Sequence, residues 1–389
     1  MKKIAIIIPT YKRPFALSRL LNSIENASYI GNADITLIIS VEGQCDPKVI
    51  EIAEAFDWSS EKIIIRHNSR LGLRDHIIFC GDQVEKYDAV IVLEEDLMVS
   101  PYYYEYAIQV LNTYDSQEGQ IASFSLYSFA INEYASLPFQ SIDDGFDNYF
   151  IQTCSSWGQI WTRSQWRSFR KWYEHSKDFA VTKDDRLPEQ VAGWPDTSWK
   201  KYFNKYMVEN NLYSVIPRIS LTTNFGDMGE HHGGTNKYQV PILNSKKEWS
   251  FSKFNESQSV YDVFFEPILE CLVSDINNIS SKEISCDLYG LKHDAFGVKY
   301  IISSRICNDK TRVVATYGCK MQPEILNILY NIKGYEFSLI KIDNDQSIKM
   351  LKQQTGNKIA RSVSFLTKRQ IIHYVFWLVR KIFLKKTNI

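Results

Sequence analysis

Residues 89–97 read Ala-Val-Ile-Val-Leu-Glu-Glu-Asp-Leu, an apolar run that leads directly into three consecutive carboxylates. The apolar part is short, uninterrupted and rich in valine and isoleucine, which is typical of a strand buried on both faces. Three adjacent carboxylates repel one another, and Mg²⁺ or Mn²⁺, which prefer oxygen ligands, would offset that repulsion. A solvated acidic strand end is the simpler alternative, so the place of this strand in the fold matters.

The chain around this motif alternates between strand and helix patterns. Strands are expected in short apolar runs, at residues 3–9, 34–41, 62–66 and 89–93. Helices are expected where apolar residues recur at helical spacing, at residues 14–27, 47–56 and 71–84. Strands separated by helices imply an α/β fold with a mainly parallel sheet that is covered on both faces. Ligands of such sheets bind outside the carboxyl ends of the strands, where the acidic motif stands.

Length and composition indicate a globular protein with more than one domain. A chain of 389 residues exceeds what one hydrophobic core usually organises. With 44% apolar and 23% charged residues, it does not fit the disordered, collagen-like or disulfide-stapled classes. Its 45 acidic and 45 basic residues balance, which removes the electrostatic argument for nucleic-acid binding. Seven scattered cysteines without a Cys-x-x-Cys pair favour reduced thiols and a cytoplasmic location.

The remainder of the chain is less regular. Many of its aromatic residues lie between Tyr102 and Phe203, where they could form a core or stack on sugar rings, and packing is the favoured interpretation. Strands at 300–303 and 312–316, followed by a helix at 323–332, predict a second, smaller α/β unit.

The end of the chain is basic and aromatic. Residues 361–389 contain seven Lys or Arg and no Asp or Glu, and their apolar stretch at 371–379 is too short to span a bilayer. A helix lying on an anionic membrane surface fits this composition. A terminal helix docked on its own protein fits it equally well.

A second motif lies at the start of the chain, where residues 6–14 read IIIPTYKRP. The strand ends at Pro9, and Thr10, Lys12 and Arg13 then precede a helix N-terminus, an arrangement able to hold the base or the phosphates of a nucleotide. The glycine motifs of dinucleotide-binding folds and of P-loops are absent, which argues against NAD enzymes and NTPases.

Taken in order, these motifs resemble the GT-A fold of nucleotide-diphospho-sugar glycosyltransferases. The resemblance is carried by IAIIIPTYKRP at 4–14, SVEG at 40–43, RHNSRLGLRDHI at 66–77 and VLEEDLMVSPYYYEY at 92–106. It continues through SSWGQIWTRSQW at 155–166, WPDTSW at 194–199 and TNFGDMGEHHG at 223–233, and so covers about the first 240 residues. The pattern is most similar to bacterial family 2 enzymes of surface-polysaccharide synthesis and to the animal N-acetylglucosaminyltransferase of N-glycan maturation.

The resemblance implies a domain organisation. Residues 1–245 would form a Rossmann-like GT-A domain, with a donor half at 1–100 and an acceptor half at 101–245. Residues 246–360 would form a smaller accessory α/β domain, and residues 361–389 the basic tail helix.

The resemblance also implies roles for single residues. Asp96 would hold Mn²⁺ or Mg²⁺, and His232 would reach the metal or the phosphates. Nucleotide-sugar contacts fall on Pro9, Thr10, Arg13, Glu42, Arg70, Arg74, Glu94 and Glu95. Within that set, Glu42 stands where an acidic residue contacts the nucleobase, while Glu94 and Glu95 would face the ribose or the donor sugar.

For the general base the resemblance points to Asp196. A gapless match to the animal enzyme places Lys200 and Lys201 where that enzyme has tandem aspartates, which is a departure from the pattern. Asp227 and Glu230 are the alternative bases, and all three acids could simply cap a helix or lie in a loop.

The expected function is metal-dependent and inverting transfer of a sugar to a hydroxyl group, in the synthesis of a capsule, an O-antigen or a similar polysaccharide. The donor would be a nucleotide-diphospho-sugar, with UDP-sugars favoured, and the acceptor a glycan or lipid-linked glycan. The enzyme would work in the cytoplasm, peripheral to the inner face of the membrane. Two alternatives stay open: a nucleotidyltransferase, although residues 9–12 lack its usual glycines, and a non-catalytic sugar-binding or assembly protein.

Overall fold

The structure is a computed structural model of the 389-residue chain. It describes residues 2–29, 35–114, 119–182, 185–227, 236–294, 296–342 and 346–353, and residues 370, 372 and 376 singly.

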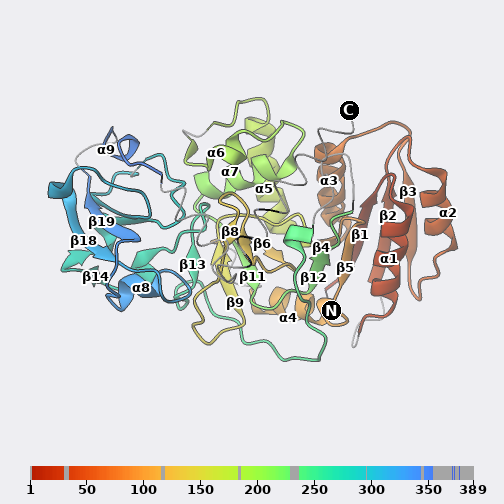
Figure 1. Ribbon diagram of the computed structural model, residues 1–389. Helices are drawn as coiled ribbons and strands as arrows, with labels where there is room; N and C mark the ends of the chain where they lie inside the picture. The colour runs from red at the N-terminus through yellow and green to blue at the C-terminus, as the bar shows by residue number, and fades with distance from the viewer. Residues whose placement is uncertain are drawn as a thin grey trace.

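A nine-stranded, mainly parallel mixed sheet forms the body of the molecule (Figure 1), in the order β13-β9-β11-β6-β10-β4-β1-β2-β3. Its strands are β1 (Ile4–Thr10), β2 (Ile35–Val41), β3 (Lys62–Arg66), β4 (Ala89–Val92), β6 (Ile121–Ser125), β9 (Asn148–Ile151), β10 (Gln159–Thr162), β11 (Tyr213–Pro217) and β13 (Val260–Tyr261). The strands β4, β1, β2 and β3 run parallel, so their carboxyl ends meet at one edge. Strand β10 is antiparallel to both of its neighbours, β4 and β6. The expected α/β class and the four N-terminal strands are therefore confirmed.

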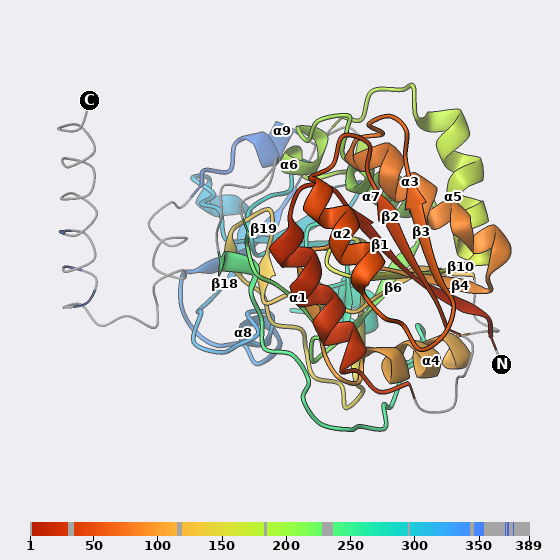
Figure 2. The same cartoon turned by 90° about the vertical axis from the view of Figure 1, so that its right-hand side faces the viewer.

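Helices cover both faces of this sheet, and each face has its own core. One face packs against α1 (Pro14–Glu25), α2 (Pro47–Ala55) and α4 (Tyr103–Thr113), and the other against α3 (Leu73–Asp82), α5 (Arg163–Ser176) and α7 (Trp199–Glu209). Figure 2 shows α1 and α2 in front of the N-terminal strands. Side chains of a strand alternate between faces, so Ile6 joins the first core and Ile7 the second. Because both sets are apolar, the whole of β1 is buried.

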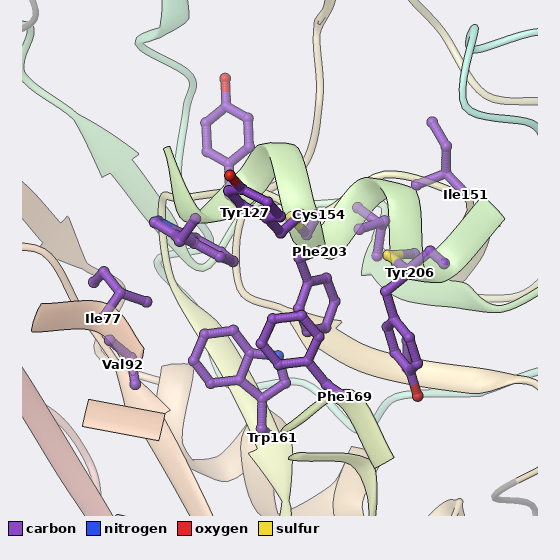
Figure 3. Close-up of a cluster of buried hydrophobic side chains, with 14 of the residues drawn as sticks. Ile77, Val92, Tyr127, Ile151, Cys154, Trp161, Phe169, Phe203 and Tyr206 are labelled. Atoms are coloured by element: carbon purple, nitrogen blue, oxygen red, sulfur yellow. The ribbon is translucent and has the colours of Figure 1, made fainter. Parts of the chain in front are cut away.

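The second core is rich in aromatic side chains (Figure 3). Trp161 of β10 lies 5.8 Å from Phe203 of α7, and Phe169 of α5 lies 4.8 Å from the same ring, centroid to centroid. All three side chains are fully buried, so here the aromatic residues pack, as the favoured interpretation expects. This cluster fixes α5 and α7 against the sheet, and with them the N-terminus of α7.

A separate four-stranded sheet follows near the end of the described chain (Figure 1, blue). It consists of β16 (Ile284–Asp287), β17 (Tyr300–Ser303), β19 (Phe337–Lys341) and β18 (Val313–Tyr317), with the short helices α8 (Leu326–Leu329) and α9 (Gln346–Lys349). The smaller C-terminal sheet is thus confirmed, while the helix expected at 323–332 is a single turn. The domain boundary expected at 245 stays a prediction, since β13 joins the large sheet from beyond it.

Several short elements complete the fold. They are α6 (Glu189–Ala192) and the two-stranded pairs β5 (Leu97–Val99) with β12 (Thr222–Asn224), β7 (Ile131–Asn132) with β8 (Leu137–Pro138), and β14 (Asp275–Ile276) with β15 (Ile279–Ser280). The pair β5–β12 brings Asn224 beside the acidic motif.

All seven cysteines are free thiols in this structure, and four of them are buried. Within the described ranges, no helix combines the length and the apolar character needed to cross a membrane. Nearly all of the tail helix expected at 361–389 lies outside the described residues.

Candidate functional site

A cavity of about 570 Å³ opens at the carboxyl ends of β1, β2 and β4, where the sequence predicts a ligand. It is lined by residues 9–13, 94–96, 156–157 and 198–200, together with Glu42, Arg70, Gly72, Leu73, His76 and Asn224. The lining therefore draws on segments that are far apart in the chain.

Most of the predicted site residues meet in this cavity. Those that line it are Pro9, Thr10, Arg13, Glu42, Arg70, Glu94, Glu95 and Asp96. Arg74 and Asp196 are outside its lining, and His232 lies outside the described residues. The individual roles assigned to these residues stay predictions.

Arg13 is bound to two of the three carboxylates of the acidic motif. Its Nε donates to Glu95 Oε1 at 2.9 Å, and its Nη1 donates to Asp96 Oδ2 at 2.8 Å. Burial alone would lower the pKa of Arg13, but the two carboxylates outweigh it and raise that pKa. The guanidinium thus stays charged and offsets the repulsion between the acids, a task that the sequence suggested for a metal ion.

Asp96 keeps one oxygen for another ligand. Its Oδ2 also accepts a hydrogen bond from Asn224 Nδ2 at 3.2 Å, whereas its Oδ1 is buried and has no hydrogen-bond partner among the described residues. A buried carboxylate oxygen needs a partner, and Mg²⁺ or Mn²⁺ would be a suitable one. The described part of the chain contains no cluster of three or more His, Cys, Asp or Glu that could hold a metal. Asp96 therefore fits a cation whose other ligands come from a bound substrate or water.

Glu94 is the carboxylate of the motif that Arg13 does not bind. It lines the cavity, and no hydrogen bond to its side chain is present in the described part of the chain. Burial, followed by the charges of Asp96 and Glu95, raises its pKa to about 8, although Arg13 and Lys200 act in the opposite direction. At neutral pH and without a ligand, this side chain is mostly protonated.

Glu42 holds the loop at 70–72 in place. Its Oε1 accepts from the backbone nitrogens of Gly43 at 3.0 Å and Leu71 at 2.7 Å, and its Oε2 accepts from that of Gly72 at 2.9 Å. A Cβ on Gly43 would lie 2.3 Å from the carbonyl carbon of Ser69, so only glycine allows this close approach. The expected contact between Glu42 and a nucleobase would have to coexist with these three bonds.

His76 is a cavity residue that sequence reasoning missed. Its Nε2 lies 2.8 Å from Ser40 Oγ, which also contacts Nε2 of His67 at 3.0 Å. Burial lowers the pKa of His76 to about 4, against the opposing effect of Glu42, so the imidazole is neutral at physiological pH. The spacing of Ser40, His67 and His76 along the chain gives no signal of this contact.

Lys200 is the second missed residue. Its side chain is 10% exposed, and its Nζ lies 3.0 and 3.2 Å from the two carboxylate oxygens of Glu133. Nζ also lies 5.6 Å from the ring centre of Trp157 and 5.2 Å from that of Trp194. The departure from the GT-A pattern at 200–201 was the available signal, but nothing in the sequence pointed to Glu133.

Asp196 and Arg74 lie next to each other outside the cavity lining. Arg74 Nη1 donates to the backbone oxygen of Asp196 at 2.9 Å. The Asp196 carboxylate is 76% exposed and accepts from Lys201 Nζ at 2.8 Å, a hydrogen bond that lowers its pKa. Of the two alternative bases, Asp227 is bound to Arg19, and Glu230 lies outside the described residues.

Comparisons with known proteins find distant structural likeness. No protein-family profile and no curated sequence matches the chain. Residues 1–349 of S. aureus TarS, in complex with UDP-GlcNAc, match at 12% identity and a TM-score of 0.40, over 59% of this chain and 60% of that one. The mannosyltransferase PcManGT from Pyrobaculum calidifontis, in complex with GDP-Man and Mn²⁺, matches at 8% identity and a TM-score of 0.32, over 44% and 46%.

The chain therefore spans less than two thirds of these structures. Its likeness to both structures is distant, at low sequence identity. A likeness of this degree carries no argument about chemistry, which has to come from the cavity itself.

Proposed function

We propose that this protein is a glycosyltransferase that moves a sugar from a nucleotide-diphospho-sugar to a hydroxyl group of a glycan. One observation carries the proposal: a single cavity at the carboxyl ends of β1, β2 and β4 contains both the N-terminal motif and the acidic motif. Its volume of about 570 Å³ lies within the usual range for small-molecule sites, about 300–1,000 Å³.

The order of the strands shows which part of the chain lines each end of the cavity. Glu42 follows β2, residues 9–13 follow or end β1, residues 94–96 follow β4, and residues 156–157 precede β10. Because these strands are neighbours in the order β10-β4-β1-β2, the lining runs from a β2 end to a β10 end with the carboxylates between them. We assign the nucleotide to the β2 end, the bond that breaks to the carboxylates, and the acceptor to the β10 end.

The nucleotide end has groups that suit a nucleoside diphosphate. Thr10 Oγ1 is buried and has no hydrogen-bond partner among the described residues, so a ligand would satisfy it. Lys12 Nζ and the Arg70 guanidinium lie 4.5 and 5.1 Å from the ring centre of Tyr11, which places two cations and an aromatic face together. A UDP-sugar is the proposed donor.

Asp96 is the residue that would hold Mn²⁺ or Mg²⁺, through its unpartnered Oδ1. Such a cation supplies charge that stabilises a departing diphosphate. Arg13 and Asn224 fix the orientation of the Asp96 carboxylate by binding its other oxygen.

The acceptor hydroxyl needs a base, and two carboxylates are candidates. Asp196, which the sequence favours, would have to leave Lys201 and turn from solvent toward the cavity when an acceptor binds. Glu94 already lines the cavity, but at neutral pH it has to lose its proton first. We retain Asp196 as the proposed base, because apo geometry alone does not exclude a candidate.

Titration calorimetry with UDP and GDP, with and without Mn²⁺, tests the proposal when it is combined with hydrolysis and transfer assays on a panel of nucleotide-sugars. We expect metal-dependent nucleotide binding and release of the sugar. Binding without any turnover would support the non-catalytic alternative, and pyrophosphate release from a nucleoside triphosphate would support the nucleotidyltransferase. Absence of nucleotide binding would refute the proposal.

We also propose a cellular context for this activity. A surface polysaccharide such as a capsule or an O-antigen is the proposed product, and a lipid-linked glycan on the inner face of the membrane the proposed acceptor. The basic tail at 361–389 would hold the enzyme near that surface.

A further inference from the structure

Lys200 lines the cavity at its β10 end, where its Nζ lies 5.6 Å from the ring centre of Trp157. Residues 198–200 and 156–157 together form this end. Lys12 and Arg70 supply positive charge at the other end, and the acidic motif lies between the two. Each end of the cavity therefore presents a basic side chain, and at the β10 end it is Lys200 in its ion pair with Glu133. A nucleoside diphosphate accounts for the basic side chains of the other end.

The position of Lys200 makes its positive charge unfavourable in free energy. A buried ammonium loses its hydration, and Lys200 stands in the first turn of α7, where the helix dipole disfavours a cation. Burial alone would lower its pKa, but Glu133 outweighs that effect and raises it, so the ammonium persists at neutral pH. Packing does not require such a pair, because apolar residues can often replace a buried ion pair without loss of stability.

The surroundings of Lys200 leave capacity for a ligand. An ammonium has three N–H donors, and within the described ranges the two hydrogen bonds of Lys200 both go to the one carboxylate of Glu133. The faces of Trp157 and Trp194 lie near Nζ but offer only a weak cation–π contact in place of water. Asn204, by contrast, is a fully buried polar neighbour on α7 whose amide oxygen accepts from the backbone nitrogen of Cys154 and whose amide nitrogen donates to Tyr134.

We propose that the β10 end of the cavity binds the carboxylate of an acidic sugar, such as a hexuronate, with Lys200 as the ligand of that carboxylate. The inference rests on the proposed function and adds a substrate class to it. A charge-assisted bond from Lys200 would accept a sugar carboxylate, whereas a neutral hexose would leave a desolvated ammonium with one carboxylate partner. The sugar acid is either the transferred residue or the terminal residue of the acceptor.

The test compares pairs of glycosides that differ only at C6. Binding of methyl glucuronoside and methyl galacturonoside is measured by saturation-transfer NMR against methyl glucoside and methyl galactoside, with and without UDP. The test variant is Lys200→Met combined with Glu133→Gln, which removes both charges and leaves no unpaired buried ion. The control is Lys205→Met, because Lys205 is also a buried lysine of α7 with carboxylate partners but is outside the cavity.

We expect the wild type and the Lys205→Met control to prefer at least one hexuronoside over its neutral partner by about tenfold or more, which corresponds to one charge-assisted bond. The double variant should lose that preference while its UDP affinity stays within about twofold of wild type. Equal binding of acidic and neutral glycosides by the wild type would overturn the proposal, as would a preference that survives in the double variant. A loss of UDP affinity in the double variant would also overturn it, because Lys200 would then be a diphosphate ligand.

Two further arms identify the source of the carboxylate. Hydrolysis of UDP-glucuronate is compared with hydrolysis of UDP-glucose, and transfer to a hexuronate-terminated oligosaccharide is compared with transfer to a hexose-terminated one. If a preference for UDP-glucuronate disappears in the double variant, the sugar acid belongs to the donor. If a preference for the hexuronate-terminated oligosaccharide disappears, it belongs to the acceptor. Glycoside binding is also measured without UDP. If the protein binds no nucleotide, the proposed function is refuted, but the glycoside measurements still test the role of Lys200.

Discussion

Arg13 Nη1 lies 2.8 Å from Asp96 Oδ2, so a guanidinium already occupies one oxygen of the carboxylate that is expected to hold a cation. Asn224 binds the same oxygen, which leaves Oδ1 of Asp96 as the position for a metal. Arg13 and a divalent ion can therefore bind Asp96 together, each through its own oxygen.

This arrangement makes Asp96→Asn a specific probe of the metal. We expect the variant to lose the part of UDP binding that depends on Mn²⁺, because an amide replaces the charged oxygen ligand that hard divalent cations prefer. Titration calorimetry with and without Mn²⁺ measures this part. Asp88→Asn, an exposed change near the opposite end of the same strand, is the control. An unchanged Mn²⁺ dependence in folded Asp96→Asn would show that the metal lies elsewhere.

Asp196→Asn tests the proposed base. The amide keeps the shape of the side chain but cannot take a proton, so turnover should fall by about 10² to 10⁴ while UDP and Mn²⁺ affinities stay near wild type. Steady-state kinetics on a responsive acceptor, together with calorimetry, separate these effects. If Asp196→Asn keeps wild-type turnover and Glu94→Gln is inactive, the role belongs to the cavity carboxylate. If both variants stay active, no carboxylate of this pair is the base.

Glu42→Gln should weaken both UDP binding and the stability of the fold, because Glu42 holds the loop at 70–72. The amide has one acceptor oxygen in place of two, and its NH₂ group would face backbone N–H donors that Glu42 now binds. Leaving a buried donor unsatisfied costs about 1–3 kcal/mol, so the free energy of unfolding should fall by that amount and UDP affinity should fall as well. Denaturant unfolding measures the first effect, with exposed Glu54→Gln as the control. Unchanged stability would contradict the role assigned to Glu42.

Glu266 predicts a pH dependence of stability that is independent of the cavity. Its Oε1 accepts from the backbone nitrogen of Tyr289, its Oε2 has no partner among the described residues, and burial with the charges of Asp287 and Asp262 raises its pKa to about 8. Between the unfolded pKa near 4.5 and about 8, the folded protein binds a proton that the unfolded chain has lost. Stability therefore falls as pH rises through this window, by up to about 1.4 kcal/mol per pH unit.

Glu266→Gln removes this contribution, because the amide resembles the protonated acid at every pH. The free energy of unfolding is measured with denaturant at pH 5.5, 6.5 and 7.5. It should fall more steeply with rising pH in the wild type than in the variant. Parallel curves for the two proteins would mean that Glu266 titrates in the folded state near its ordinary pKa.

Removal of residues 361–389 tests the membrane role of the tail. Each Lys or Arg near an anionic surface contributes about 1 kcal/mol, so the truncated protein should bind anionic liposomes more weakly and keep its turnover on small acceptors. Liposome sedimentation at two salt concentrations measures the difference. Misfolding of the truncated protein would favour the alternative of a docked terminal helix, and equal binding of both forms would refute the membrane role.

The sequence predicts the boundaries of a strand well where the strand is a continuous apolar run. The strand β3 begins and ends at the predicted residues, and β1, β2 and β4 differ by only a residue or so, because continuous apolar runs bounded by polar residues have few other stable arrangements. The pair β5–β12 could not be predicted in this way. Its strands are three residues each, and their pairing across more than a hundred residues depends on the rest of the fold.

In the candidate site, too, some features could be predicted from the sequence and others could not. Strand ends at one edge of a parallel sheet must meet, so the meeting of Thr10, Glu42 and Glu94 follows from topology. The side-chain partners do not follow from it. Arg13 could equally have faced a phosphate, and the ion pair between Lys200 and Glu133 joins a helix to a distant loop with no periodic pattern in either.

The position of β10 between β4 and β6 has a consequence for synthesis of the chain on the ribosome. The motif-bearing strand β4 is fully apolar and acquires its second neighbour only when residues 159–162 pair with it. A nascent chain that has emerged only as far as residue 100 therefore presents β4 as an unprotected edge, a template for association with other chains. The first hundred residues contain most of the motifs that we propose to bind the nucleotide, and we expect them to aggregate when they are expressed alone. They should therefore not serve as a module that can be moved to another protein.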